Sequence, residues 1–255
     1  MAPSFKGGHL LPLVKKAARE ARNRRACRTL MAGLAAGDQD LIERIRDRRL
    51  SYLSSAKLAG IATLCRQLDD AEVPGVFIEA GCALGGSTIL IASVKDRDRP
   101  LSVYDVFGMI PPPSETDTDD VHDRYRTIAA GRSKGIGGDR YYGYEPDLYE
   151  MVCANLSAFD LDRERESISL VKGLLQETLV VDQPVAFAHI DVDWYDPVMT
   201  CLTRIFPRLA PAGTIVLDDY HDWGGCRKAT DEFLATVHDR VTLDDTTGAM
   251  TITRG

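Results

Sequence analysis

The feature that most constrains this chain is the alternation of short apolar runs with helical stretches after about Pro74. This alternation is typical of an α/β fold with a parallel, doubly wound sheet and helices on both faces. The runs expected to form buried strands are GVFIEA, LSVYDV, SISLVKG, VAFAHID and GTIVLDD, and the expected helices are 86–95, 145–158, 197–209 and 224–238. The closing segment RVTLDDTTGAMTITRG has two strand-like runs around a Thr-Gly turn, which predicts an antiparallel hairpin at one sheet edge.

The residues before the sheet have helical periodicity, with Asp38 or Asp40 available as a helix N-cap. We therefore expect a helical N-terminal cap over residues 1–73 and a sheet domain over residues 74–255. Within that domain, residues 108–143 are too polar and too rich in glycine to pack as core. A long loop of this kind predicts a lid that orders over the bound acceptor.

The net charge of the chain limits the kinds of partner that it can bind. The net charge is -7 and the isoelectric point is near 5.3, whereas nucleic-acid binders usually carry a basic stripe. The basic run over residues 15–28 is interpreted as a solvated helix face with an apolar side. No apolar segment approaches the roughly 20 residues that span a bilayer, so we expect no membrane partner and a cytoplasmic location. The six cysteines lack metal-binding spacing and are expected to be reduced, buried thiols.

A glycine-rich turn, FIEAGCALGGST, follows the first expected strand. Gly81, Gly85 and Gly86 would let a cofactor approach the backbone closely, although their spacing departs from the dinucleotide fingerprint. Glu79 beside the turn would repel a pyrophosphate but attract a cationic sulfonium. Asp105, at the end of the second strand, can accept hydrogen bonds from both hydroxyls of a ribose. Together these residues favour S-adenosylmethionine over NAD.

Carboxylates gather after the last two parallel strands. Asp191 follows the fourth strand, and Asp218 and Asp219 follow the fifth, so all three are expected at the carboxyl edge of the sheet. Their mutual repulsion would be relieved by a hard divalent cation, and oxygen ligands select magnesium, calcium or manganese, of which magnesium suits best. His189 is expected in the core or behind the ligands, and His221 is expected to line the site.

Six motifs carry a resemblance to a known family: FIEAGCALGGST, YDVFG, KGLLQETL, HIDVDWYDP, FPRLAPAGTIVLDDY and CRKATDEF. From about Tyr52 to its end the chain resembles the macrocin and mycinamicin type of sugar O-methyltransferases, which use magnesium and S-adenosylmethionine to methylate deoxysugar hydroxyls on natural products. The resemblance implies a Rossmann-like class I methyltransferase fold. It also implies site residues: Asp191, Asp218 and Asp219 as metal ligands, Asp193 as general base, and Ser87, Gly173 and Glu177 as further cofactor contacts.

The two aspartates of DVD are expected to have different roles. Alternation along an extended strand would put Asp191 and Asp193 on the same side, about 6.6 Å apart. One could then hold the metal while the other receives the substrate proton. Asp196, followed by Pro197, is interpreted as the N-cap of the next helix with proline at its first position.

The residues favour an enzyme that binds S-adenosylmethionine and magnesium, and the resemblance implies an O-methyltransferase that acts on a sugar hydroxyl of an antibiotic-type natural product. A cation that chelates two neighbouring hydroxyls suits any vicinal diol, so a catechol-type small-molecule O-methyltransferase stays open. A metal-dependent hydroxylase on a related sheet is the other alternative. The expected partners are a small-molecule substrate and further copies of the chain in a homo-oligomer, without nucleic acid.

Overall fold

A mixed sheet of seven strands forms the centre of the computed structural model, which describes residues 24–25 and 27–255. The sheet has the order β3-β2-β1-β4-β5-β7-β6. Its strands are β1 (Val76–Ala80), β2 (Leu101–Asp105), β3 (Ile168–Lys172), β4 (Val185–Ile190), β5 (Leu209–Leu217), β6 (Val241–Asp244) and β7 (Met250–Arg254). Strands β1 to β5 pair in parallel, whereas β7 is antiparallel to both β5 and β6. The predicted doubly wound, mostly parallel sheet with a hairpin at one edge is confirmed.

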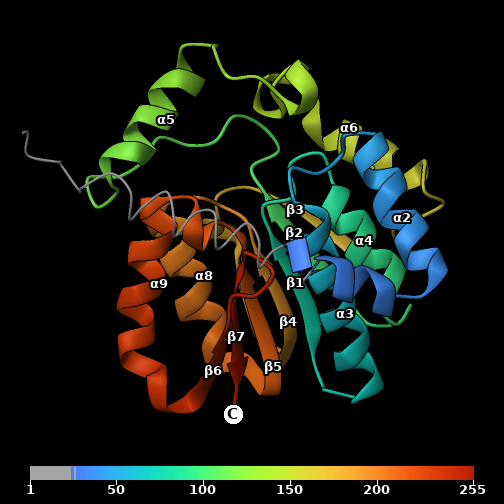
Figure 1. Ribbon diagram of the computed structural model, residues 1–255. Coiled ribbons are helices and arrows are strands. Elements are labelled where there is room, and N and C mark those ends of the chain that lie inside the picture. The colour runs from blue at the N-terminus through green and yellow to red at the C-terminus, as the bar shows by residue number, and fades with distance from the viewer. Residues whose placement is uncertain (1–23, 26) are drawn as a thin grey trace, which may run out of the picture.

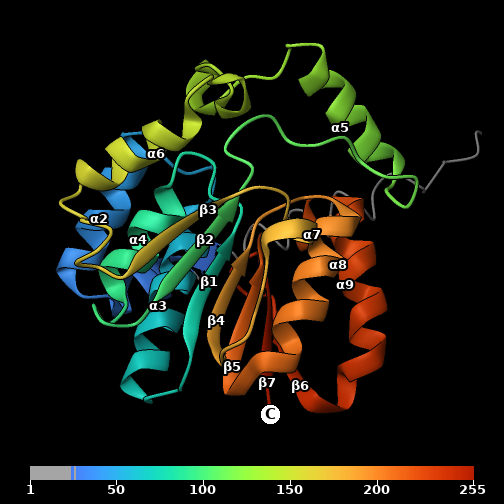
Figure 2. The ribbon, with the colours of Figure 1, turned by 180° about the vertical axis from the view of Figure 1, so that it is seen from behind.

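Helices cover both faces of this sheet (Figures 1 and 2). One face carries α2 (Ala36–Asp47), α3 (Ser55–Asp70), α4 (Gly86–Val94) and α6 (Leu148–Ser157). The other carries α7 (Leu175–Thr178), α8 (Tyr195–Ile205) and α9 (Gly224–Val237). Short 3-10 helices are η3 (Phe206–Arg208), η4 (Asp218–His221) and η5 (His238–Arg240). The four helices predicted within the sheet domain form as α4, α6, α8 and α9, with ends displaced by a few residues.

The described N-terminal helices share one hydrophobic core with the sheet. Ile42 and Leu58, from α2 and α3, are fully buried in the same cluster as Phe77 of β1 and Leu101 of β2. Burying a side chain of this size contributes about 1.5–3 kcal/mol. Helices α2 and α3 are therefore held against the strands whose ends form the candidate site.

Helix α2 begins differently from the sequence prediction. Its N-cap is Ala35, and Asp38 lies in its first turn, so neither Asp38 nor Asp40 caps the helix. Asp38 is instead paired with Arg66 of α3, whose Nη2 lies 2.9 Å from Oδ1. The carboxylate therefore joins two helices instead of capping one.

Helix α8 also departs from the prediction. Its N-cap is Trp194, so Asp196 and Pro197 lie inside its first turn. The backbone N–H of Tyr195 donates to Oδ1 of Asp117 at 2.7 Å. A distant carboxylate thus supplies the capping bond that Asp196 was expected to provide.

Residues 108–143, which we call the arch, pass over the carboxyl edge of the sheet (Figure 1). They contain α5 (Asp119–Ala129) and η1 (Ile136–Gly138), and η2 (Tyr142–Tyr144) begins at their end. Helix α5 buries Val121 and Ile128, so the expectation that the segment is too polar to pack was wrong there. The arch is hydrogen-bonded to the sheet domain, because Trp194 Nε1 donates to the carbonyl oxygen of Pro111 at 2.9 Å.

The N-terminal basic run falls mainly on residues that lie outside the described part of the chain. Its described members are helical, at residues 24–25 and 27–28. Among the residues that the structure describes, no helix has both the length and the apolar character needed to cross a membrane.

Candidate active site

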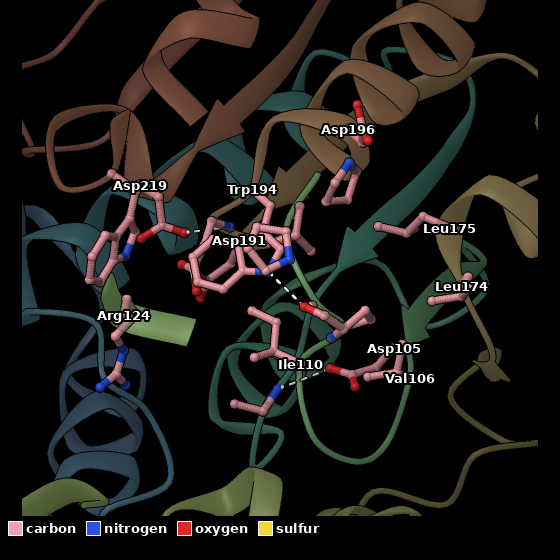
Figure 3. A pocket seen from close by; sticks show the side chains of 18 of the residues that line it. Asp105, Val106, Ile110, Arg124, Leu174, Leu175, Asp191, Trp194, Asp196 and Asp219 are labelled. Carbon is pink, nitrogen blue, oxygen red and sulfur yellow. Dashed lines mark hydrogen bonds between the residues drawn. The ribbon is translucent and has the colours of Figure 1, made fainter. Parts of the chain in front are cut away.

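A cavity of about 640 Å³ lies at the carboxyl edge of the sheet, where the arch contributes part of its wall. The carboxyl end of each parallel strand supplies a lining residue: Asp105 is the last residue of β2, and Gly81, Gly173, Asp191 and Asp218 directly follow β1, β3, β4 and β5. Figure 3 shows the side chains of Asp105 and Asp191 among others that line the cavity. Open parallel sheets bind ligands at this edge, because the ends of all the strands meet there.

Two glycines of the FIEAGCALGGST turn are required by packing. Gly81 has a φ of +83°, and a Cβ built on it would lie 2.0 Å from the carbonyl oxygen of Asp191. A Cβ on Gly86 would lie 2.4 Å from the carbonyl oxygen of Leu50. The sequence analysis explained these glycines only by the close approach of a cofactor to the backbone. In the structure they let neighbouring segments of the chain pack together.

Asp105 holds the glycine turn from the end of β2. Its Oδ2 accepts hydrogen bonds from the backbone N–H groups of Cys82 at 2.8 Å and Ala83 at 3.3 Å. Its Oδ1 accepts from the N–H of Phe107 at 2.6 Å. Burial raises the pKa of Asp105, and these backbone hydrogen bonds oppose that rise. Because Asp105 also lines the cavity, its position is compatible with a ribose hydroxyl as a further donor.

Glu79 lies behind the glycine turn and does not line the cavity. It is fully buried, accepts a hydrogen bond from Thr88 Oγ1, and has Oε1 3.2 Å from His189 Nδ1. His189 is also fully buried, as expected for a core histidine. Glu79 therefore belongs to a buried polar network, and the expectation of direct cofactor contact does not fit its position.

The predicted cofactor residues divide into two groups. Gly81, Asp105 and Gly173 line the cavity, whereas Glu79, Gly85, Gly86, Ser87 and Glu177 do not. Ser87 is buried within α4, and Glu177 lies on the exposed side of the short α7. Gln176, its neighbour, lines the cavity instead.

Three carboxylates meet at the other end of the cavity. Among the described residues, Asp191, Asp193 and Asp219 each offer an oxygen that lies within 4.8 Å of the other two. Asp193 has a φ of 55°, so the chain leaves the extended conformation after β4 ends at Ile190. The expectation that alternation keeps Asp193 well apart from the ligand Asp191 was therefore wrong. A left-handed aspartate at such a site is a form of strain that often accompanies function.

Asp218 lies outside that group of three and is paired with a lysine. Lys57 Nζ of α3 lies 2.9 Å from Oδ2 of Asp218 and 3.2 Å from Oδ2 of Asp222. The other oxygen of Asp218, Oδ1, is buried without a hydrogen-bond partner in the described chain. The sequence analysis did not identify Lys57. The only sign of its role in the sequence is weak: a lysine lies between Ala56 and Leu58, which are buried in an apolar helix.

The acidic residues perturb one another. Burial, and then the charge of Asp219, raises the pKa of both Asp191 and Asp193 well above the usual value. Burial also raises the pKa of Asp219 itself. The guanidinium of Arg124 on α5 opposes the rise at Asp193. Carboxylates that raise each other's pKa in this way are a common feature of metal sites and catalytic sites.

The donor set fits a hard divalent cation. All the candidate ligands are carboxylate oxygens, and Oδ1 of Asp218 is a buried acceptor that lacks a partner within the described residues. Asp191 and Asp219 supply the neighbouring oxygens, and such sets suit magnesium, calcium or manganese. His221, which was expected to line the site, lies outside the cavity lining, with Nε2 3.3 Å from Oδ2 of Asp245.

Aromatic side chains form much of the remaining wall, and sequence reasoning did not single them out as site residues. Tyr52 and Tyr142 pack edge to face with ring centroids 5.8 Å apart, and Trp194 and Trp223 do so at 6.2 Å. All four line the cavity together with Tyr141, over whose ring Arg124 lies at 5.5 Å. Such a wall suits the faces of a sugar ring or of a planar aglycone.

The sheet order and the position of the cavity define a Rossmann-like class I methyltransferase fold, as the sequence predicted. The solved O-methyltransferase NovP has this fold, with a TM-score of 0.68, 23% identity, and coverage of 80% of this chain and 82% of that one. The calicheamicin methyltransferase CalS11 superposes with a TM-score of 0.61, at 18% identity and with full coverage of both chains, 100% each.

The chain belongs to the macrocin-O-methyltransferase (TylF) family, whose model matches residues 49–250. It is 28% identical over 170 residues to the demethyldecarbamoylnovobiocin O-methyltransferase of Streptomyces niveus, covering 64% of this chain and 60% of that protein. It is also 28% identical over 170 residues to the mycinamicin III 3''-O-methyltransferase of Micromonospora griseorubida, covering 63% of this chain and 61% of that protein. The matches thus span about three fifths of these relatives.

Proposed function

We propose that this protein transfers the methyl group of S-adenosylmethionine to a sugar hydroxyl of a natural product, with the help of magnesium. One observation carries the proposal: a single cavity joins the glycine turn and Asp105 to a cluster of three carboxylates, of which Asp219 is buried and Asp191 and Asp193 are half-buried. Membership of the macrocin-O-methyltransferase family supports the reaction, and the mycinamicin methyltransferase among the relatives supports a glycosylated acceptor.

The cofactor end of the cavity would be formed by Gly81, Asp105 and Gly173. S-adenosylmethionine, when bound, supplies an electrophilic methyl group on a sulfonium. Asp105 would accept hydrogen bonds from the ribose hydroxyls, because its side chain lines the cavity and has acceptor capacity beyond its three backbone partners. The adjacent carboxylates would also favour the positive sulfonium electrostatically.

The cation would be held by Asp191, Asp219 and Oδ1 of Asp218. When bound, magnesium lowers the pKa of a hydroxyl that contacts it and orients that hydroxyl. We assign Asp218 to the ligands because its free oxygen is buried, and because its other oxygen is already fixed by Lys57. The carboxylate of Asp193 then remains available for proton transfer.

Asp193 would act as the general base. It lines the cavity together with Arg124 and Tyr141 of the arch. Asp193 would take the hydroxyl proton as the oxygen bonds to the methyl carbon and the bond from that carbon to sulfur breaks, which would leave S-adenosylhomocysteine as the second product.

The arch and the aromatic wall would position the acceptor. The pair Tyr52 and Tyr142 and the pair Trp194 and Trp223 offer ring faces for the sugar and its aglycone. We propose that the arch closes over the bound acceptor to exclude water from the sulfonium. Such positioning supplies much of the rate of a bimolecular transfer.

Methyl transfer from radiolabelled S-adenosylmethionine tests this proposal. Protein treated with chelator is expected to lose turnover, to keep its affinity for the cofactor in calorimetry, and to regain turnover when magnesium is added. Deoxysugar glycosides and catechols, offered in competition, distinguish a sugar acceptor from a catechol. Full turnover in excess chelator would refute the metal requirement, and oxygen consumption without methyl transfer would indicate a hydroxylase instead.

A further inference from the structure

Lys57 has an unusual position for a lysine at a cavity. Its Nζ lies 2.9 Å from Oδ2 of Asp218, 3.0 Å from the backbone oxygen of Asp218, and 3.2 Å from Oδ2 of Asp222. Its side chain is only 13% exposed. An ammonium has three N–H donors, and these three acceptors engage all of them. Lys57 therefore has no donor left for a substrate, so its function lies in the carboxylates that it binds.

The acidic cluster has little other compensation within the described chain. The lysine and arginine side chains among its cavity-lining residues are Lys57 and Arg124. Arg124 lies on the arch over the ring of Tyr141, whereas Lys57 is hydrogen-bonded to Asp218, the carboxylate next to Asp219 of the cluster. Unpaired buried carboxylates that face one another are costly, so a fixed ammonium beside them stabilises the fold.

We propose that Lys57 is a built-in counter-cation, which stabilises the acidic site before a divalent cation binds and lowers the affinity for that cation. The metal part rests on the proposed function. The same carboxylates attract both cations, and the two cations repel each other across a short distance. Lys57 binds Oδ2 of Asp218 and leaves Oδ1 available to a metal. The ammonium can therefore stay in place when the cation binds.

The test compares wild type with Lys57→Met, which keeps an unbranched apolar chain but removes the charge. Without metal, the thermal midpoint of Lys57→Met is expected to fall by about 4 °C or more. Saturating manganese, used as the probe cation, should recover most of that loss. In calorimetry the manganese Kd should decrease about ten-fold, because the competing charge is gone.

Lys228→Met is the matched control. Lys228 is likewise half-buried, but its Nζ donates to the backbone oxygen of Thr116 at 2.9 Å and makes no ion pair with a described carboxylate. Its manganese affinity should equal that of wild type. If Lys57→Met has an unchanged or weaker manganese affinity, or an equal loss of stability with and without manganese, Lys57 is only a packing or orienting residue and the proposal is overturned.

A double variant keeps the proposal testable if Lys57→Met does not fold without metal. In the variant that combines Lys57→Met with Asp218→Asn, the charge that Lys57 compensates is removed as well, so metal-free stability should return to that of Asp218→Asn. No recovery overturns the proposal. A wild type that binds no manganese would refute the metal site of the proposed function, whereas the metal-free comparison would still decide whether Lys57 compensates Asp218.

Discussion

The two ends of the cavity use carboxylates in opposite ways. At the cofactor end, Asp105 accepts hydrogen bonds from three backbone N–H groups; behind that end, outside the cavity lining, Glu79 accepts a hydrogen bond from Thr88 and lies beside His189. At the acidic end, the carboxylates face mainly one another, and their pKa values rise. A carboxylate whose charge is stabilised by backbone hydrogen bonds needs no ligand to be stable in the fold. Carboxylates that repel one another are stabilised only when a cation binds between them. We therefore expect the cofactor end to be preformed and the acidic end to be completed by metal.

The largest effect is expected from removing a carboxylate of the acidic end. Asp219→Ala should reduce turnover roughly 10³-fold, because the cation loses a ligand and the hydroxyl loses its activation. Affinity for S-adenosylmethionine, measured by calorimetry, should stay near that of wild type. A comparable loss of cofactor affinity would show that the two ends are not independent.

The two aspartates of DVD should then separate ligand from base. Asp193→Asn is expected to lower kcat by about 10²–10⁴-fold at every magnesium concentration, with near-normal manganese affinity. Asp191→Asn, its control, should lose manganese affinity and regain part of its activity at high magnesium. Titrating kcat against magnesium for both variants gives the answer. If magnesium rescues Asp193→Asn and not Asp191→Asn, the two assignments are reversed.

A smaller effect is expected at the cofactor end. Asp105→Ala removes the acceptor of three backbone N–H groups as well as the proposed ribose contact, and should cost about 1–3 kcal/mol in cofactor binding. Manganese affinity should not change. Asp182→Ala, at an exposed position in the loop before β4, serves as the control. Unchanged calorimetric affinity in Asp105→Ala would place the ribose partner elsewhere.

The smallest effect concerns stability and pH in the absence of metal. The pKa values of Asp191 and Asp193 are raised in the folded state, so the folded protein retains protons that the unfolded chain releases. The stability they contribute is complete below the unfolded pKa of 3.8 and is lost as pH rises through the raised values. Asp193→Asn should therefore melt about 2–4 °C above metal-free wild type at neutral pH, and the difference should vanish near pH 4. A difference that is constant with pH would contradict mutual repulsion.

Much of the fold could be predicted from local patterns. Apolar runs and turn residues identified the strands, because a buried parallel strand must be apolar along its length. The exception was α5, whose signals were Asp119 and Asp120 in its first turn and the helical spacing of Val121 and Ile128. The segment was predicted not to pack because most of its residues are polar. A short amphipathic helix buries only one narrow face, so a few apolar residues are enough to hold it.

The candidate site was predictable only as a set of carboxylates. That residues following β4 and β5 meet is a consequence of parallel strand order, which the sequence predicted. Asp193 joins Asp191 and Asp219 at a point where the chain is no longer extended, because Asp193 has a left-handed φ of 55°. An L-residue rarely adopts that conformation, so periodicity could not have predicted it.

The sequence by itself determined the class of sheet, the glycine turn and the acidic character of one site, because these depend on neighbours along the chain. Only the tertiary structure decided how the charges are compensated. Lys57 reaches Asp218 across 161 positions of sequence, and Asp105 reaches the turn residue Cys82 across 23. Helix α3 brings Lys57 there because its apolar face packs in the core shared with the sheet. Such a partnership depends on where whole elements pack, and no local pattern encodes it.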